Sequence, residues 1–157
     1  MLHVPVAVDR PFGLTASPAV AFAFLRDVPA WGALFPHVET VEPLDGEPEA
    51  FVWTLEPLGP PGVAVRTVYA CRYVPDDDAR TLTWTPVEGV GNARFQGGVA
   101  LAPGTTGGTD GRLWLRATLE IPAPGFARAV VGPAVQLAFR QMMATFLERL
   151  DAALGGG

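Results

Sequence analysis

The carboxy-terminal segment 124–154 is predicted to form one long helix. Its large apolar residues recur at steps of four or three positions, which places them on one face of an α-helix. This stripe consists of Val131, Val135, Phe139, Met142, Phe146 and Leu150. Because Val130, Ala134 and Leu137 lie off the stripe, we expect the first half of the helix to be covered on several sides or to face something other than solvent. Such a helix needs a large apolar surface to pack against.

Upstream of this helix, apolar and polar side chains alternate, and Gly, Pro, Asn and Asp separate the alternating runs. The predicted strands are Val38–Leu44, Ala50–Leu58, Val63–Val74, Arg80–Pro86, Asn92–Ala102 and Leu113–Ile121. One face of these strands is apolar and aromatic, and the other carries arginines such as Arg66, Arg72 and Arg116. Because all the connections are short, neighbouring strands are expected to pair antiparallel as a six-stranded meander.

The amino-terminal part predicts a strand and two short helices. The strand is Val4–Leu14. Ser17 followed by Pro18 is a strong helix start, because serine caps a free N–H group and proline at the first helical position lacks a donor that would go unused. Asp27 is expected to cap the next turn in the same way, before a second short helix at Ala30–Phe35. A curved sheet wrapped round the terminal helix is the economical way to bury all these apolar faces.

The composition excludes several classes of function. The net charge is −5 and the chain has no lysine, whereas a nucleic-acid-binding protein needs a basic face. No apolar run is long enough to span a bilayer, and the amino terminus lacks the basic region and apolar run of a secretory signal, so we expect a cytoplasmic protein. With one cysteine, Cys71, and two histidines, the sequence predicts no metal site, no internal disulfide and no cofactor.

Three stretches of the sequence carry a resemblance to a known superfamily. They are FLRDVPAWGALFPHVETVEPL at residues 24–44, WTPVEGVGNARFQGG at residues 84–98, and the helix that ends in FLERL at residues 146–150. With these stretches the chain resembles the START-like, Bet v 1-like helix-grip superfamily, which includes polyketide cyclases and lipid-transfer proteins. Residues 27–41 are also similar to its coenzyme Q-binding and ribosome-association-inhibiting branch. The resemblance implies one α+β domain over residues 1–157, with an internal cavity between the sheet and the last helix, and it leaves the function open.

The loops at the two ends of the predicted meander differ in composition. At one end they are polar and acidic, and at the other they are apolar and rich in proline and glycine. Because loops normally run over the surface, a group of apolar loops suggests a mouth through which an apolar ligand enters. The predicted mouth consists of Phe35, His37, Leu58, Val90 and Phe126. The alternative is that the prolines and glycines of these loops only make stiff turns.

Few side chains could act chemically on a ligand. His37 and Glu88 are the titratable groups placed at the mouth, which makes them the weak candidates for acid–base catalysis. The predicted ligand-binding residues share the apolar face of the strands or the stripe of the helix. They are Trp53, Thr67, Tyr69, Tyr73, Trp84, Phe95, Leu115, Phe139 and Met142. The alternative is that these are core aromatics whose hydroxyl groups find partners within the protein.

The sequence favours a protein that binds, carries or sequesters a hydrophobic small molecule, such as a lipid, a polyketide or a quinone-like compound. One alternative is an aromatase/cyclase, which the resemblance permits and which would need ordered polar groups in the cavity. The other is a partner-binding protein like the ribosome-association inhibitors, with its contact on the outer face that carries Arg66, Arg72 and Arg116. The sequence is also compatible with a protein partner or with a homodimer.

Overall fold

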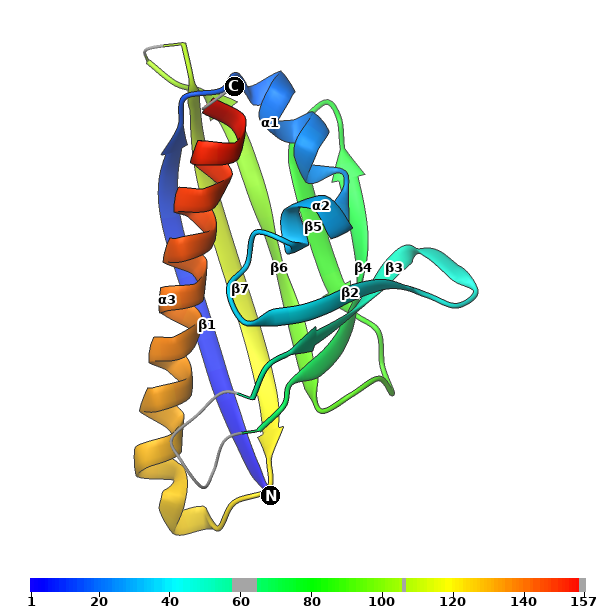
Figure 1. Cartoon of the computed structure of the whole chain (residues 1–157), viewed down its shortest axis with the longest axis vertical. Coiled ribbons are helices and arrows are strands. Elements are labelled where there is room, and N and C mark those ends of the chain that lie inside the picture. The colour runs from blue at the N-terminus through cyan, green and yellow to red at the C-terminus, as the bar shows by residue number, and fades with distance from the viewer. Residues whose placement is uncertain (58–64, 106, 156–157) are drawn as a thin grey trace.

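A seven-stranded sheet curves round one long helix in the computed structural model, which describes residues 1–57, 65–105 and 107–155 (Figure 1). The strands are β1 (Leu2–Leu14), β2 (Val38–Leu44), β3 (Glu47–Leu55), β4 (Val68–Asp76), β5 (Thr81–Pro86), β6 (Ala93–Pro103) and β7 (Thr109–Ile121). The helices are α1 (Pro18–Leu25), α2 (Val28–Gly32) and α3 (Arg128–Gly155), and the short 3-10 helix η1 (Gly125–Ala127) precedes α3. The predicted α+β helix-grip order of elements is confirmed.

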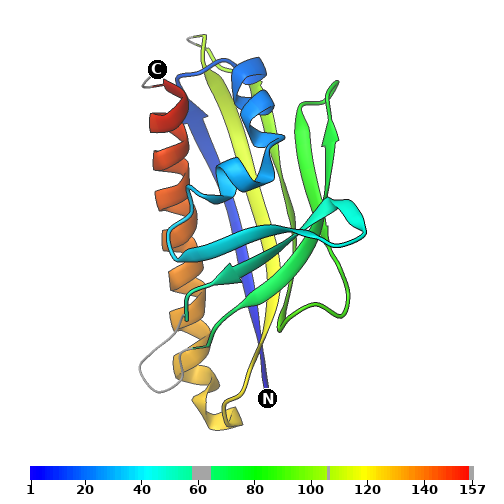
Figure 2. The same cartoon turned by 45° about the vertical axis from the view of Figure 1, so that its right-hand side comes forward.

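The sheet is an antiparallel meander that the first strand extends at one edge. Its strand order is β1-β7-β6-β5-β4-β3-β2, and every neighbouring pair is antiparallel. β1 pairs with β7 along its whole length, from Leu2 opposite Ile121 to Leu14 opposite Thr109. Figure 2 shows β2 and β3 crossing in front of the other strands toward α3, while β1 runs along the helix. Both edges of the sheet therefore approach α3.

Two side-chain caps fix the corner between β1 and β2. The Ser17 hydroxyl accepts a hydrogen bond from the Val20 N–H (3.3 Å), and the Asp27 carboxylate accepts one from the Ala30 N–H (3.3 Å). Both caps agree with the sequence, but α2 begins at Val28 and ends at Gly32, whereas Ala30–Phe35 was predicted. Because Asp27 is the capping residue, the helix includes the two residues that follow it, and Phe35 is left in the connection to β2.

The apolar stripe of α3 faces the sheet, as predicted. Every stripe residue is buried, and Phe139 and Phe146 are among the largest fully buried side chains. The helix continues through Pro133. The prediction that the first half of the helix is covered on several sides is wrong for Val130 and Leu137, which are 63% and 55% exposed. The sheet covers only one side of α3, and Val130 and Leu137 lie on the side away from it.

Polar contacts hold α3 against the free edge of β1. The Gln136 amide donates to the Ala7 carbonyl oxygen (2.7 Å) and accepts from the Ala7 N–H (3.1 Å), which satisfies edge backbone groups as a neighbouring strand would. Further along, the Asp151 carboxylate accepts from the Thr15 N–H (2.9 Å). Arg149 donates to the carbonyl oxygen of Leu34 (3.1 Å), which ties α3 to the connection between α2 and β2.

The strand boundaries differ from the predicted ones around β3 and β4 and at the start of β7, which begins at Thr109 instead of Leu113. β3 begins at Glu47, three residues before the predicted start, because the chain reverses at Asp45-Gly46, where Gly46 has a positive φ of 80°. β4 begins at Val68, whereas the predicted strand began at Val63, which lies outside the described residues. Over the residues described here, no helix is long and apolar enough to cross a membrane.

Candidate functional site: an aromatic cavity between the sheet and α3

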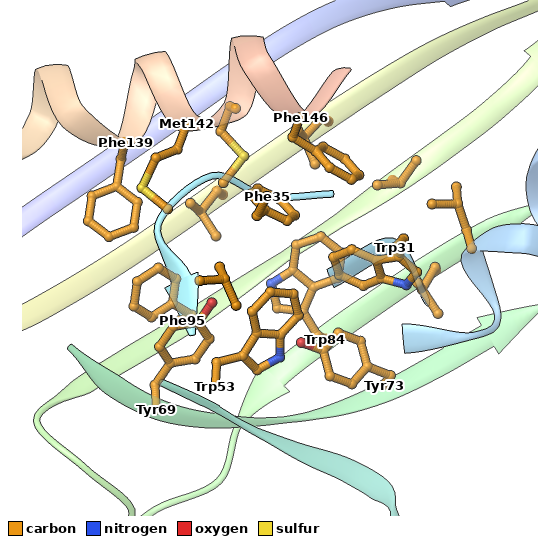
Figure 3. A pocket seen from close by; sticks show the side chains of 17 residues that line it. Trp31, Phe35, Trp53, Tyr69, Tyr73, Trp84, Phe95, Phe139, Met142 and Phe146 are labelled. Carbon is orange, nitrogen blue, oxygen red and sulfur yellow. The ribbon is translucent and has the colours of Figure 1, made fainter. Parts of the chain in front are cut away.

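A cavity of about 40 Å³ lies between the inner face of the sheet and α3 (Figure 3). Its wall is built from α1, α2, the α2–β2 connection, the strands β2 to β7, and α3. The residues that line it are Leu25, Trp31, Phe35, Val38, Trp53, Tyr69, Tyr73, Leu82, Trp84, Phe95, Val99, Leu113, Leu115, Phe139, Met142, Met143 and Phe146. None of these side chains carries a formal charge at neutral pH, so the wall suits an apolar guest.

Aromatic side chains fill most of the space between the sheet and α3. Trp31 lies among them, with its ring centroid 5.2 Å from that of Trp53 and 5.9 Å from those of Tyr73 and Phe146. Phe35 stacks on Phe146 at a centroid distance of 4.1 Å, which brings the α2–β2 connection against α3. The wall is therefore a set of mutually packed rings, contributed by segments far apart in the sequence.

Successive side chains of a strand point to opposite faces of the sheet, and this alternation directs the aromatic rings inward. On β4, Tyr69, Cys71 and Tyr73 are buried toward the inside, whereas Arg72 points outward. On β6, Gly97 leaves room for its neighbours, because a Cβ atom there would lie 3.1 Å from the ring of Trp84 and 2.2 Å from a backbone oxygen of β7. A larger residue at this position would clash with the backbone of β7 and crowd the ring of Trp84.

The cavity is too small for a ring-sized guest unless side chains move. An apolar cavity of about 150 Å³ is known to admit benzene, and this one measures about 40 Å³. Met142 and Met143 supply the α3 side of the wall, and their unbranched thioether side chains adopt several shapes at low cost. Enlargement of the cavity through these methionines is compatible with an unchanged backbone.

The polar groups of the wall are hydroxyl and indole N–H groups. Burial raises the pKa of Tyr69 and of Tyr73 well above its ordinary value, and the neighbouring Cys71 acts in the same direction. Burial also raises the pKa of the Cys71 thiol to about 12, and this thiol donates a hydrogen bond to the Phe95 carbonyl oxygen (3.3 Å). These groups are therefore protonated at neutral pH and can serve as hydrogen-bonding groups, not as bases.

The structure brings most of the predicted ligand-binding residues into one wall. Trp53, Tyr69, Tyr73, Trp84, Phe95, Leu115, Phe139 and Met142 all line the cavity. Thr67 does not line the cavity. It is buried immediately before β4, and its carbonyl oxygen accepts a hydrogen bond from the Leu55 N–H (2.9 Å). That the lining residues bind a ligand stays a prediction.

The predicted mouth is not assembled at the cavity. Among those of its residues that the structure describes, only Phe35 lines the wall. Val90 lies in a surface hollow together with Glu88 and Arg94, Phe126 is 87% exposed on η1, and Leu58 is outside the described residues. η1, which carries Phe126, lies at the amino-terminal end of α3, whereas the cavity is lined by residues from the middle of that helix, such as Phe139 and Met142 (Figures 1 and 3).

The two candidate catalytic residues are also apart. His37 Nδ1 lies 3.1 Å from a carboxylate oxygen of Glu56, and Glu88 pairs with Arg94. Neither His37 nor Glu88 lines the cavity, and they occupy different surface hollows. His37 and Glu88 therefore do not face a common guest. Among the described residues, no three His, Cys, Asp or Glu side chains are placed to hold a metal ion.

A surface hollow next to His37 leads toward the cavity. It is lined by Pro36, His37, Ala138, Gln141, Met142 and Thr145, from the α2–β2 connection and α3. Met142 belongs to both linings, that of the hollow and that of the cavity. Met142 is therefore the residue at which the hollow and the cavity come closest to a common lining.

The outer face of the sheet is less basic than the arginine count suggests. Arg66 pairs with Glu39, and Arg72 pairs with Glu47. Arg112 pairs with Asp9, with N–O distances of 2.5 and 2.9 Å. The cross-strand carboxylates neutralise these positions, so this face does not present the uninterrupted positive charge that an acidic partner would select.

Sequence reasoning missed several wall residues. Leu82, Val99 and Leu113 share the parity of the predicted residues Trp84, Phe95 and Leu115 on their strands, so the alternation could have found them. Met143 and Phe146 follow Met142 on the same helix. No sequence signal marks Trp31, because α2 has only five residues and no periodicity to reveal its inner face.

A family of known proteins and several solved structures are similar to this chain. A family model described as polyketide cyclase/dehydrase and lipid transport matches residues 5–155. None of the curated proteins matches the sequence. Three solved structures illustrate the likeness, and because each is less than 25% identical to this chain, they bear on the fold alone.

A START superfamily protein from Mycobacterium smegmatis has a TM-score of 0.67 at 14% identity, over 96% of this chain and 97% of that one. The protein TTHA0849 from Thermus thermophilus has a TM-score of 0.64 at 23% identity, and the match covers 95% of this chain and 98% of that one. The Zhui aromatase/cyclase from a Streptomyces species has a TM-score of 0.53 at 20% identity, and the match covers 95% of this chain and 88% of that one. With the family match over nearly the whole chain, the protein belongs to the polyketide cyclase/dehydrase and lipid transport family.

Proposed function

We propose that this protein binds a small, uncharged hydrophobic molecule in the cavity between the sheet and α3. The observation that carries the proposal is the wall itself, which gathers aromatic and aliphatic side chains from nearly every element and includes no charged group. Such concave, mainly apolar sites with a few polar groups are typical of small-molecule binding. The family description, which joins cyclase activity with lipid transport, agrees with a hydrophobic ligand.

Binding is better supported than catalysis. A cyclase or dehydrase needs a group that gives or takes a proton near neutral pH, held within reach of the substrate. The titratable groups in the wall are the Tyr69 and Tyr73 phenols, whose pKa burial raises further from neutrality. The His37 and Glu88 side chains lie outside the wall. The partner-binding alternative is weaker because ion pairs occupy Arg66 and Arg72 of the outer face.

A filled cavity should not bind the guest. In a Val99→Phe variant the new ring enters the cavity from β6, between the neighbouring wall residues Leu82 and Leu113, so we expect the affinity for 2-ethylnaphthalene, an uncharged apolar probe, to fall at least about tenfold. Binding is measured by isothermal titration calorimetry or by quenching of tryptophan fluorescence, and the fold is checked by thermal melting.

The matched control is Val74→Phe, the same replacement at a position on β4 that is 53% exposed, and it should leave the affinity unchanged. Equal affinities of the wild type and Val99→Phe would place the guest elsewhere on the protein. If the wild type binds no probe, and native mass spectrometry of the protein before any delipidation shows no bound molecule, the proposed function fails.

Uptake should proceed through the hollow beside Met142. A tryptophan at Ala138 would cover this side chain from outside, so we expect Ala138→Trp to slow the association of 2-ethylnaphthalene by about tenfold in stopped-flow fluorescence. The control Val90→Asp changes the loop that was predicted to form the mouth, and it should leave the rate unchanged. Slow uptake by Val90→Asp together with normal uptake by Ala138→Trp would instead restore the mouth at the loop end of the sheet.

A further inference from the structure

Four apolar residues are exposed along the outward side of η1 and the first half of α3, at one end of the molecule (Figures 1 and 2). We name them the helix patch, and they are Phe126, Val130, Pro133 and Leu137. Steps of three or four residues place them on one line, opposite the buried stripe that packs on the sheet. After Leu137 the same line continues with the exposed polar residues Arg140 and Gln141. The outward side of α3 thus changes from apolar to polar along the helix.

The helix patch departs from what a helix on the surface of a protein ordinarily shows. Such a helix carries charged or polar side chains opposite its buried stripe, as the second half of α3 does. A contiguous exposed apolar surface marks a contact with another protein or with a membrane. Since the sheet covers only the other side of α3, the apolar character of this stretch is explained by a contact outside the chain.

The charges near the helix patch distinguish between its possible partners. From residue 121 to residue 147 the chain has no Asp or Glu, although acidic residues outnumber basic ones by 16 to 11 overall. Arg128 follows Phe126 closely, Arg140 comes just after Leu137, and both arginines are exposed. In the part of the chain that the structure describes, neither of them forms an ion pair. Unpaired positive charge therefore accompanies the apolar line.

We propose that the helix patch docks on the surface of a bilayer that contains anionic lipids. Apolar side chains can enter the boundary between headgroups and acyl chains, while the arginines meet the lipid phosphates. A second copy of this chain is a less suitable occupant, because two-fold pairing of the patch would bring the arginines of both copies together. None of the patch residues lines the cavity, so this proposal stands or fails independently of the proposed function.

The net charge of −5 is compatible with this docking. At physiological salt, exposed charges farther than about 8 Å from the lipid phosphates are largely screened, so the charge of the docking surface counts more than that of the whole chain. Raising the salt concentration should weaken the binding, because it also screens the two arginines.

Co-sedimentation with vesicles tests the proposal. We expect the wild type to bind vesicles of equal parts phosphatidylglycerol and phosphatidylcholine, and to bind pure phosphatidylcholine vesicles at least about tenfold more weakly. Arg128→Gln with Arg140→Gln should lower the affinity for the mixed vesicles about 25-fold, since each arginine near an anionic surface contributes about fivefold. The matched control, Arg10→Gln with Arg116→Gln, removes two exposed arginines of the sheet and should leave the affinity unchanged.

The apolar part of the patch has its own variant. Phe126→Gln with Leu137→Gln should lower the affinity for the mixed vesicles at least about tenfold, because the new side chains gain little from leaving water. Val20→Gln with Val74→Gln, the corresponding change at exposed apolar positions of α1 and β4, should bind like the wild type. Thermal melting checks the fold of each variant.

A fluorescent label locates the contact directly. Cys71 is buried and unreactive, so a cysteine introduced by Val130→Cys is the thiol that takes up an environment-sensitive dye. The emission of this dye should shift to shorter wavelength on the mixed vesicles, whereas a dye attached after Val74→Cys should not respond.

Failure of the wild type to bind the mixed vesicles, or equal binding by the wild type and the four double variants, would overturn the proposal. So would a wild-type dimer that binds no vesicles and that Phe126→Gln with Leu137→Gln converts into a monomer in sedimentation equilibrium, because a second copy would then cover the patch. Binding of 2-ethylnaphthalene in the cavity should be the same in all these variants, which keeps a failure of docking distinct from a failure of the proposed function.

Discussion

Replacing Phe139 with alanine is expected to lower the free energy of unfolding by about 3–5 kcal/mol, the range for removal of a buried aromatic side chain. Phe139 is 1% exposed and lies on the stripe of α3, with its ring 5.5 Å from that of Phe95 on β6. The variant loses both the burial of the ring and the contact that joins the helix to the sheet. Urea titration followed by far-UV circular dichroism measures the loss.

Leu137→Ala is the matched control, two positions away on the same helix and 55% exposed. Its free energy of unfolding should stay within about 0.5 kcal/mol of the wild type, because an exposed leucine loses little on truncation. A loss of less than about 1 kcal/mol for Phe139→Ala would mean that the stripe of α3 is not part of the core. A large loss for Leu137→Ala would mean that the exposed side of α3 is covered in solution.

Gly91→Ala is the second change with a large expected effect. Gly91 has a positive φ of 73°, and a Cβ atom there would lie 1.9 Å from the carbonyl oxygen of Val68. That oxygen also accepts the Asn92 N–H (3.0 Å), and Asn92 Oδ1 accepts the Val68 N–H (2.9 Å), so the clash falls on the contact that fixes the start of β4. The left-handed backbone costs an alanine about 1–2 kcal/mol, and the overpacking adds about 1–3 kcal/mol.

Gly89→Ala separates these two costs. Gly89 also has a positive φ, 81°, but a Cβ atom there meets nothing within 4 Å. Its free energy of unfolding should therefore fall only by the backbone cost, about 1–2 kcal/mol. The same urea titration compares the two variants. Equal losses would show that the Val68 carbonyl moves aside without cost, and that the loop after β5 is not held against β4.

Local features of the sequence were enough to predict the main helices and strands and the buried faces of several of them. The steps of four and three residues identified the buried stripe of α3, and the alternation identified the inward side of β4 and β7. The caps at Ser17 and Asp27 were predictable because a capping side chain acts within three residues of itself. These signals follow from backbone periods that hold wherever a helix or strand buries one side.

The mouth could not be predicted in the same way. The composition of the loops did not locate the cavity along α3. Val90 turned out to lie beside Arg94, and Phe126 to be exposed, because the α2–β2 connection meets the middle of the helix instead. That meeting depends on how far the sheet curves, which no single stretch of the chain determines.

The sequence by itself determined the α+β class, the order of the elements and the buried side of α3 and of strands such as β4 and β7, since these depend on backbone period and on capping and turn residues close in the chain. The tertiary structure decided the volume of the cavity and the place of Trp31 in its wall. These properties depend on the distances between side chains from α2, β3 and α3. Such distances are fixed only when the curved sheet closes on the helix and all the rings pack at once.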